Sequence, residues 1–279
     1  FSTLPNHTVG QSLRPFPQYV NINMPYSPEG ISNYNALQLK VTKRYSNGLT
    51  LLAFYTRSKL MTNDDFAPID LGEGVGNIQN PLNRNGEYSV SQDDYPNAFR
   101  VSFSYQLPFG PGKQFLNDKS LLGRVVGGWE VAGSIQRQSG PPLSITANTS
   151  LSQFGYPTIR ANYIGGQDVY ATYSGSFNPA TDLYLNPSAF TNPSAFEFGN
   201  TGRVLNWVRG PQINSEALSL RKNFTIAERL RMVLRADAAN PFNIVRWSNP
   251  NTSITSASYG VINGSHAARV IQLSFSLAF

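Results

Sequence analysis

The chain has 279 residues, of which 14% are charged, 12% are aromatic and 40% are hydrophobic, and its formal net charge at pH 7 is +6. Soluble domains carry about 25% charged residues, so this composition favours a surface that meets lipid on one side and water on the other. No apolar run reaches the roughly 18 residues of a membrane-spanning helix, cysteine is absent, and the scattered cations argue against a nucleic-acid partner.

The first two predicted strands form a hairpin. Residues 33–45 and 49–59 both alternate apolar and polar side chains, and the turn between them contains Asn47-Gly48. An Asn-Gly turn between two alternating runs is a strong hairpin signal. Leu37, Leu39 and Val41 share one face of the first strand, so that face is expected to be apolar.

Four more strands are predicted in the middle of the chain. The third spans residues 98–109, after a polar stretch over 60–95, and the fourth begins at Trp129, continues through Ile135 and is expected to resume at 143–145. The connection between them predicts a helical turn around 118–126. After an irregular region over 148–212, the fifth and sixth strands span 215–224 and 229–239 and are joined by four residues.

The last predicted strand spans residues 271–279. Its large apolar side chains, Leu273, Phe275, Leu277 and Phe279, fall on one face, while Gln272, Ser274 and Ser276 fall on the other. An edge strand of a soluble sandwich is the alternative, but such edges are usually protected by lysine or proline, and this strand has neither. The pattern therefore favours a barrel strand that faces lipid.

The connections between these strands alternate between short and long. Membrane barrels show this alternation because their periplasmic turns are short and their extracellular loops are long. We therefore predict an all-β, antiparallel transmembrane β-barrel. About seven strands are too few and odd in number, so we expect the carboxy-terminal part of a larger barrel; an eighth strand hidden in residues 15–24 or 156–173 is the alternative.

Short phrases in a fixed order along the chain point to one family. They include Arg44-Tyr45-Ser46-Asn47-Gly48-Leu49, Tyr105-Gln106-Leu107-Pro108-Phe109-Gly110, Gly128-Trp129-Glu130-Val131-Ala132-Gly133, Gln138-Ser139-Gly140-Pro141-Pro142, Phe198-Gly199-Asn200-Thr201-Gly202-Arg203, Arg209-Gly210-Pro211 and Leu218-Ser219-Leu220-Arg221-Lys222-Asn223-Phe224. From about residue 14 to 279, the chain resembles the Oar-like TonB-dependent outer-membrane receptors.

The resemblance implies a plugged barrel of roughly 22 strands, of which residues 1–279 would form about the last third, without the plug and amino-terminal domains. It implies a bacterial outer-membrane location and a role in the uptake of an unidentified ligand. The implied partners are outer-membrane lipid, the remaining strands and plug of the same receptor, the TonB system and the barrel-assembly machinery. The terminal strand, with Leu273, Phe275, Leu277 and Phe279, looks like the signal that this machinery reads.

Few residues suggest chemistry. The two histidines, His7 and His266, lie in predicted loops without a nucleophile motif, so we expect neither an enzyme nor a cofactor. Four acidic residues in one loop are weak calcium ligand candidates, because calcium prefers carboxylate oxygens: Asp64, Asp65, Asp70 and Glu73. Their spacing is not that of an EF-hand, so a solvated acidic loop is the favoured explanation.

Two further groups are candidates for contact with a ligand. Arg231, Arg235 and Asp237 share the polar face of the sixth strand and are expected to face the lumen, as an ion-paired wall or as a plug contact. Tyrosines in the longest loop offer rigid apolar rings with polar tips, which suit sugars or peptides, but aromatic residues also mark the membrane interface: Tyr156, Tyr163, Tyr170, Tyr173 and Tyr184. A small stand-alone structural or adhesive barrel and a secreted sugar-binding sandwich remain alternative functions.

Overall fold

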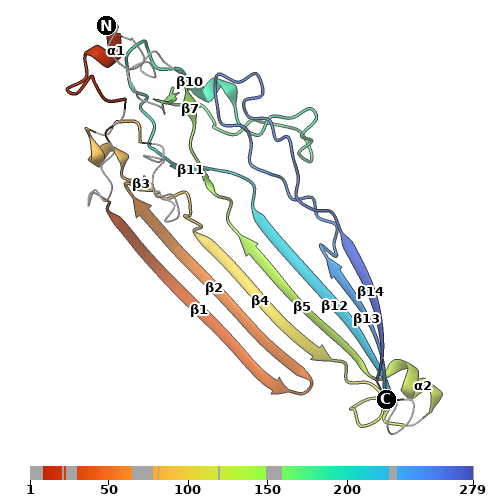
Figure 1. Ribbon diagram of the computed structural model, residues 1–279. Coiled ribbons are helices and arrows are strands. Elements are labelled where there is room, and N and C mark those ends of the chain that lie inside the picture. The colour runs from red at the N-terminus through yellow and green to blue at the C-terminus, as the bar shows by residue number, and fades with distance from the viewer. Residues whose placement is uncertain are drawn as a thin grey trace.

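One long antiparallel sheet dominates the computed structural model, which describes residues 9–20, 22, 30–64, 78–80, 82–118, 120–148, 159–225 and 231–278 (Figure 1). Neighbouring strands of the sheet follow one another along the chain, in the order β1-β2-β4-β5-β12-β13-β14, and β3 adds to the edge of β2. The bounds are β1 Ser32–Ser46, β2 Leu49–Thr62, β3 Ser89–Val90, β4 Asn97–Gln106, β5 Trp129–Gln138, β12 Ile213–Thr225, β13 Arg231–Ala239 and β14 Val270–Ala278.

The seven long strands are those expected from the period-two runs. The main difference lies at the end of the third strand, which stops at Gln106 instead of residue 109. Pro108 follows, and a proline has no N–H for a ladder hydrogen bond. The predicted resumption of the fourth strand at 143–145 is also wrong for the main sheet, because Pro142–Leu143 forms the short strand β6, which pairs with β11 (Leu205–Arg209).

The strand register separates two faces of the sheet. Residues directly opposite each other on neighbouring strands point to the same side, so the register extends each strand's alternation across the whole sheet. What we call the apolar face contains Leu37, Leu39, Val41, Phe99, Val101, Phe103, Leu218, Leu220, Leu234, Leu273, Phe275 and Leu277. The polar face contains Gln38, Lys40, Arg100, Ser102, Ser104, Glu130, Gln136, Ser219, Arg221, Arg235, Asp237, Gln272, Ser274 and Ser276.

The connections differ between the two ends of the sheet. The Asn47-Gly48 turn, the connection that contains helix α2 (Leu121–Val126) and the end of β14 lie at one end, which we call the short-turn end (Figure 1). Asn47 and Gly48 have φ values of 52° and 80°, the left-handed conformation that this hairpin turn requires. The long segments gather at the opposite end, as the alternation of connection lengths predicted.

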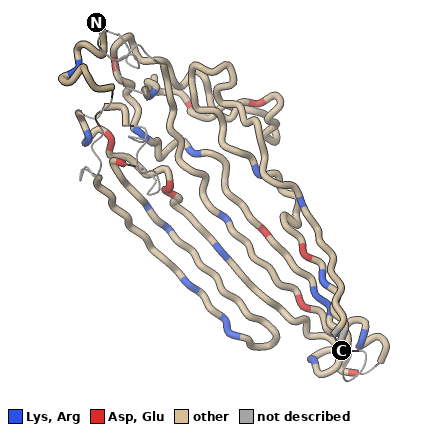
Figure 2. Tube along the Cα trace, viewed as in Figure 1, with Lys and Arg blue, Asp and Glu red and all other residues tan. Residues whose placement is uncertain are grey.

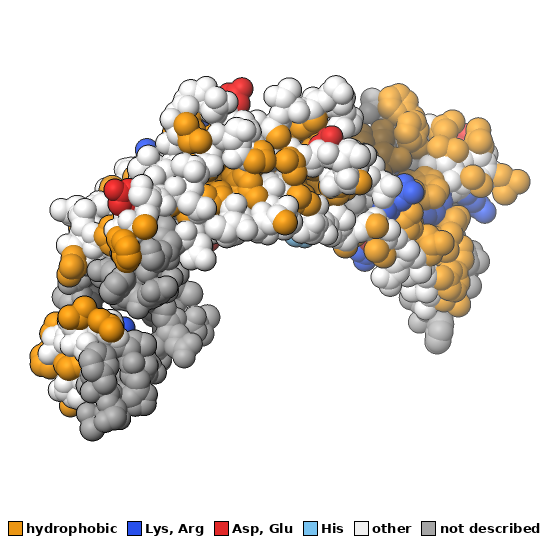
Figure 3. Space-filling model, turned by 90° about the horizontal axis from the view of Figure 1, so that it is seen from above, with side chains coloured by type: hydrophobic (Ala, Val, Ile, Leu, Met, Phe, Trp, Pro, Cys, Tyr) orange, Lys and Arg blue, Asp and Glu red, His pale blue; other side chains and the backbone are white. Residues whose placement is uncertain are grey.

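Viewed from the end that carries the long segments, the molecule is a curved arc (Figure 3). β1 and β14 form the two edges of the main sheet and do not pair with each other in the described residues, so the barrel is not closed. No eighth long strand occurs in the described parts of the two candidate regions. Residues 15–20 form no strand, and 159–173 contains only two short strands, β8 (Ile159–Arg160) and β9 (Asn162–Tyr163).

The long segments pack together around the main apolar core. Short strands β7 (Thr146–Ala147) with β8, β9 with β10 (Phe190–Thr191), and β6 with β11 form three two-stranded sheets there. The buried core residues come from two connections, the one between β5 and β12 and the one between β13 and β14: Leu143, Ile145, Ala161, Val169, Leu185, Ala189, Phe190, Leu205, Val208 and Tyr259. We call this packed region the loop assembly. Its core shows that these segments form a defined structure, although they read as irregular in the sequence.

The helices are short. They are α1 (Val9–Ser12), α2 and the 3₁₀ turns Arg84–Glu87 and Pro187–Ala189. The helical turn predicted around 118–126 is confirmed by α2, whose Ser120 side chain accepts a hydrogen bond from the Gly123 N–H. A serine at this position satisfies one of the free amides at a helix start. Among the described residues, no helix has the length and apolar character needed to cross a bilayer.

Candidate functional site

A hollow of about 350 Å³ lies on the polar face between β5, β12, β13 and β14. Its floor is formed by small residues, including Ala132, Ser134, Ala217 and Ser219, which leave room above the sheet. Arg235 and Asp237 stand at its border and form an ion pair with a 2.8 Å separation. Arg235 also donates a hydrogen bond from Nε to the Ser219 hydroxyl at 3.1 Å.

The ion pair belongs to a charged row that crosses the sheet. Glu130 lies opposite Arg221, and Arg221 lies opposite Arg235, so one carboxylate and two guanidinium groups follow one another across three strands, with Gln106 and Ser274 at the two ends of the row. The Ser104 hydroxyl donates to Glu130 at 2.7 Å. Figure 2 shows that positions of charged residues also occur along the neighbouring strands. Such a row can hold water and polar solutes against the wall. The Arg231 side chain lies outside the described residues.

The tyrosines predicted for ligand contact belong to two aromatic clusters of the loop assembly. Tyr163 contacts Trp207 at a ring separation of 4.9 Å and Phe190 at 5.6 Å. The second cluster links Tyr170, Tyr173, Phe177, Tyr184 and Trp247 through edge-to-face contacts of 5.3 to 6.1 Å. Edge-to-face packing is favourable for aromatic rings, so these clusters stiffen the loops. Tyr156 lies outside the described residues.

The tyrosine hydroxyl groups also hold the main chain of the loop assembly. The Arg209 N–H donates to the Tyr170 hydroxyl at 2.8 Å, and the Tyr184 hydroxyl donates to the Arg209 carbonyl at 3.0 Å. Burial raises the pKa of Tyr184 above its usual value, since the phenolate would lose hydration. Tyr170 and Tyr173 remain about two-fifths exposed, so of these three tyrosines they offer the larger contact surface.

Buried ion pairs, which the sequence patterns did not reveal, tie the loop assembly together. Glu87 pairs with Arg160, and Glu87 also accepts hydrogen bonds from the backbone of Gln79 and Asn80. Arg203 is fully buried and donates to the carbonyls of Glu87 and Thr62. Burial lowers the pKa of the Arg160 guanidinium, while Glu87 opposes that shift.

Two more buried carboxylates fasten the loop assembly to the sheet. Asp94 pairs with Arg209 at 2.6 Å, and Glu216, near the start of β12, pairs with both Arg137 of β5 and Arg246. The partners in these pairs are 30 to 115 residues apart in sequence, which is why no local motif indicates them. These contacts make the loop assembly a rigid platform above the strands.

Of the four calcium candidates, only Asp64 lies within the described residues, so the calcium site stays a prediction. Asp64 pairs with Arg84 at 3.3 Å, and Asp65, Asp70 and Glu73 lie outside the described residues. No group of three or more histidine or acidic side chains in the described part of the chain could hold a metal ion. His266 donates its backbone N–H to the Arg246 carbonyl, and His7 lies outside the described residues.

At the short-turn end, Lys222 interrupts the apolar face. Its side chain is 1% exposed, and its ammonium donates to the carbonyls of Arg124, Val125 and Gly127 at the end of α2. The ammonium also lies over the rings of Trp129 and Phe224 at 5.3 and 4.9 Å. Lys222 therefore holds α2 against the sheet.

The residues of the proposed assembly signal lie on the free edge strand. Leu273, Phe275 and Leu277 are all exposed on the apolar face of β14, and Phe279 lies outside the described residues. Together with the apolar residues of the other strands, they form a continuous exposed apolar surface, which soluble monomeric proteins rarely show. The arrangement fits a sheet whose apolar face meets lipid.

Comparison with known proteins agrees with this geometry. A family model described as an outer membrane beta barrel domain matches residues 2–272. No curated protein and no solved structure matches the chain. The match covers nearly the whole chain, and it supports the predicted location in the bacterial outer membrane. The two-faced antiparallel sheet and this match together show that the chain belongs to the outer membrane β-barrel domain family.

Proposed function

We propose that this chain forms the carboxy-terminal wall of a larger, TonB-dependent outer-membrane transporter and shapes the entrance for its ligand. The observation that carries the proposal is the open arc of seven long strands with one polar face. A barrel of about eight strands has an interior that side chains fill or that holds one small ligand, whereas a barrel of roughly 22 strands has a wide lumen that can hold a plug. The polar row and the hollow of about 350 Å³ fit the wall of such a lumen. The ordered resemblance to Oar-like receptors supports the same parent protein.

The parts of the chain have separate roles in this proposal. The apolar face meets the membrane, while the polar row around Arg235 and Asp237 faces the lumen, where it contacts the plug or a passing solute. The rigid loop assembly surrounds the entrance and offers Tyr170 and Tyr173 as an aromatic surface. Energy would come from the inner membrane through TonB and the plug of the same receptor.

Uptake that depends on both the protein and the energy supply tests the proposal. Cells with and without the gene are grown on media that contain siderophores, oligosaccharides and peptides, and the depletion of each compound is measured by mass spectrometry. The measurement is repeated in cells without TonB. A transporter predicts at least one compound whose depletion needs the gene and also needs TonB.

Two results would count against the proposal. Depletion that needs the gene but continues without TonB indicates a passive barrel, and identical depletion profiles with and without the gene exclude a transport role under those media. An adhesive role is the second candidate, because the buried ion pairs give the loop assembly a fixed surface with exposed aromatic rings. The single main sheet does not fit the two packed sheets of a secreted sandwich.

A further inference from the structure

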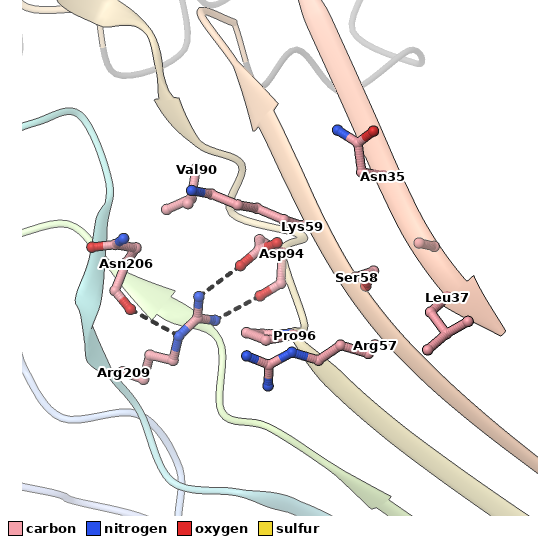
Figure 4. A pocket seen from close by; sticks show the side chains of 11 residues that line it. Asn35, Leu37, Arg57, Ser58, Lys59, Val90, Asp94, Pro96, Asn206 and Arg209 are labelled. Carbon is pink, nitrogen blue, oxygen red and sulfur yellow. Dashed lines mark hydrogen bonds and ion pairs between the residues drawn. The ribbon is translucent and has the colours of Figure 1, made fainter. Parts of the chain in front are cut away.

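A second hollow, of about 670 Å³, lies where β1 and β2 meet the loop assembly. Figure 4 shows Arg57 and Lys59 extending from β2 toward Asp94 and Arg209 of the loop assembly. Asn35 and Leu37 line it from β1, and Asn206 lines it from β11. The volume lies within the range of small-molecule sites, which is about 300 to 1,000 Å³.

The register places this hollow on the apolar face. Lys59 lies opposite Asn35 and Arg57 lies opposite Leu37, which belongs to the apolar face, so both cations project from the side that meets lipid. The next row of side chains on this face, two residues closer to the short-turn end, contains Leu39 of β1, Tyr55 of β2 and Phe99 of β4. Aromatic residues of barrels gather at the membrane interface. Arg57 and Lys59 therefore lie at the level of the lipid headgroups, just beyond the row that contains Tyr55 and Phe99.

The charges around the hollow do not balance. Arg209 is committed to protein partners, since its Nη2 pairs with Asp94, its Nη1 donates to the carbonyls of Asp94 and Gly140, and its Nε donates to the Asn206 carbonyl. In the described residues, no carboxylate pairs with Arg57 or Lys59; Arg57 donates to the Asn97 side-chain carbonyl at 2.9 Å. The residues that line the hollow carry three positive charges, on Arg57, Lys59 and Arg209, and one negative charge, on Asp94. Because Arg209 pairs with Asp94, the exposed charges of Arg57 and Lys59 are available to an anion.

An apolar track leads away from the hollow. Leu37, Leu39 and Val41 follow one another down the apolar face of β1, and each is more than half exposed. A ligand that combines an anionic group with a hydrocarbon chain would match both features at once. A free polar anion would use the cations and leave the track unused.

We infer that this hollow binds the phosphorylated headgroup of an outer-leaflet lipid, with Arg57 and Lys59 on the phosphate and an acyl chain along Leu37, Leu39 and Val41. Guanidinium and ammonium groups both bind phosphate oxygens through charge-assisted hydrogen bonds. The site lies on the opposite face from the polar row, so it concerns the seating of the barrel in its membrane and does not depend on the proposed transport role.

Lipid titration followed by native mass spectrometry tests this site. The whole protein is extracted from outer membranes in dodecylmaltoside and titrated with diphosphorylated lipid A and with the same lipid after removal of its phosphates. The wild-type protein should bind the phosphorylated lipid about tenfold more tightly, because each exposed charge pair contributes modestly and two act together. The combined variant Arg57→Gln and Lys59→Gln should bind both lipids equally weakly.

Matched variants separate charge from folding. Lys43→Gln removes a cation from the same face of β1 at the short-turn end, and it should leave the preference for phosphate unchanged. Arg57→Lys keeps the charge and should retain most of the preference. The fold of each variant is checked by the heat-dependent shift of its band on a detergent gel.

Three results would overturn the inference. The first is equal binding of both lipids by the wild-type protein. The second is an equal loss of preference in Lys43→Gln and in the combined variant, which would indicate general attraction by surface charge. The third is full displacement of the lipid by inorganic phosphate, which would indicate a site for a free anion.

Discussion

Replacement of Leu273 by arginine gives the sharpest test of the apolar face. The Leu273 side chain is 77% exposed and lies opposite the small Ala236 on β13, so it has little protein packing to lose. If this face met water, the change would alter the free energy of unfolding by less than about 0.5 kcal/mol. If it meets lipid near the bilayer midplane, the arginine should cost about 2–4 kcal/mol.

Ser276→Arg on the same strand is the matched control. Ser276 lies on the polar face directly opposite the uncharged Val233 and only diagonal to Arg235, whereas Ser274 lies directly opposite Arg235, where an arginine would add the stronger repulsion between like charges. Arginine at position 276 should cost less than about 1 kcal/mol because it points to the aqueous side.

The assay is reversible urea unfolding of the whole protein from phosphatidylcholine vesicles, followed by tryptophan fluorescence. The midpoint and slope give the free energy of unfolding for the wild-type protein and each variant. Equal costs for Leu273→Arg and Ser276→Arg would refute the assignment of the two faces. If Leu273→Arg left the free energy of unfolding unchanged, position 273 would not contact lipid.

Three other changes test the supports of the structure. Gly199→Ala places a methyl group against the Arg160 carbonyl oxygen, closer than van der Waals contact allows, so hydrogen exchange should speed up across β8 and β9 but not in the long strands; unchanged exchange would contradict this packing. Glu87→Ala leaves the buried Arg160 guanidinium without its carboxylate, which should destabilise the loop assembly by about 3–5 kcal/mol, seen as faster proteolysis there. Lys222→Met removes the ammonium from the α2 carbonyls, so trypsin should cleave at Arg124 sooner; an unchanged cleavage rate would show that α2 is held by other contacts.

The strands could be predicted because each one carries its own evidence. The alternation in residues 33–45 and 271–279 fixes which side chains share a face, and the Asn47-Gly48 turn fixes the register of the first hairpin. These signals are local, so one sequence is enough to read them. The apolar face of the terminal strand, for example, can be predicted from the strand's own sequence without knowing which strand pairs with it.

The loop assembly could not be predicted because its contacts are distant in sequence. Glu87 and Arg160 are 73 residues apart, and Arg203 reaches a carbonyl 141 residues away. Neither pair produces a period or a motif. The phrases that resemble Oar-like receptors do mark the assembly, since Gly140, Gly199 and Arg203 all occupy tightly packed positions, but their physical role appears only in three dimensions.

The hollow at Arg57 and Lys59 did leave a signal in the sequence. Along the apolar face of β2, Leu49, Leu51, Ala53 and Tyr55 are followed by Arg57 and Lys59, so the apolar run stops before the strand does. That change marks the level at which the face leaves the hydrocarbon region.

The cations on this face also limit the thickness of the buried band. On β1, Lys43 lies eight positions along the strand from Asn35, which is opposite Lys59. This span is about 27 Å along the strand, and a strand tilt of about 40° reduces it to about 21 Å across the membrane. Lysine side chains extend their charged ends toward water, which adds several ångströms and approaches the roughly 25 Å band of outer-membrane barrels. Because cations mark both boundaries, Arg57 and Lys59 at one and Lys43 at the other, the bilayer can slide little along the wall, and the lipid site at Arg57 and Lys59 falls in one headgroup layer.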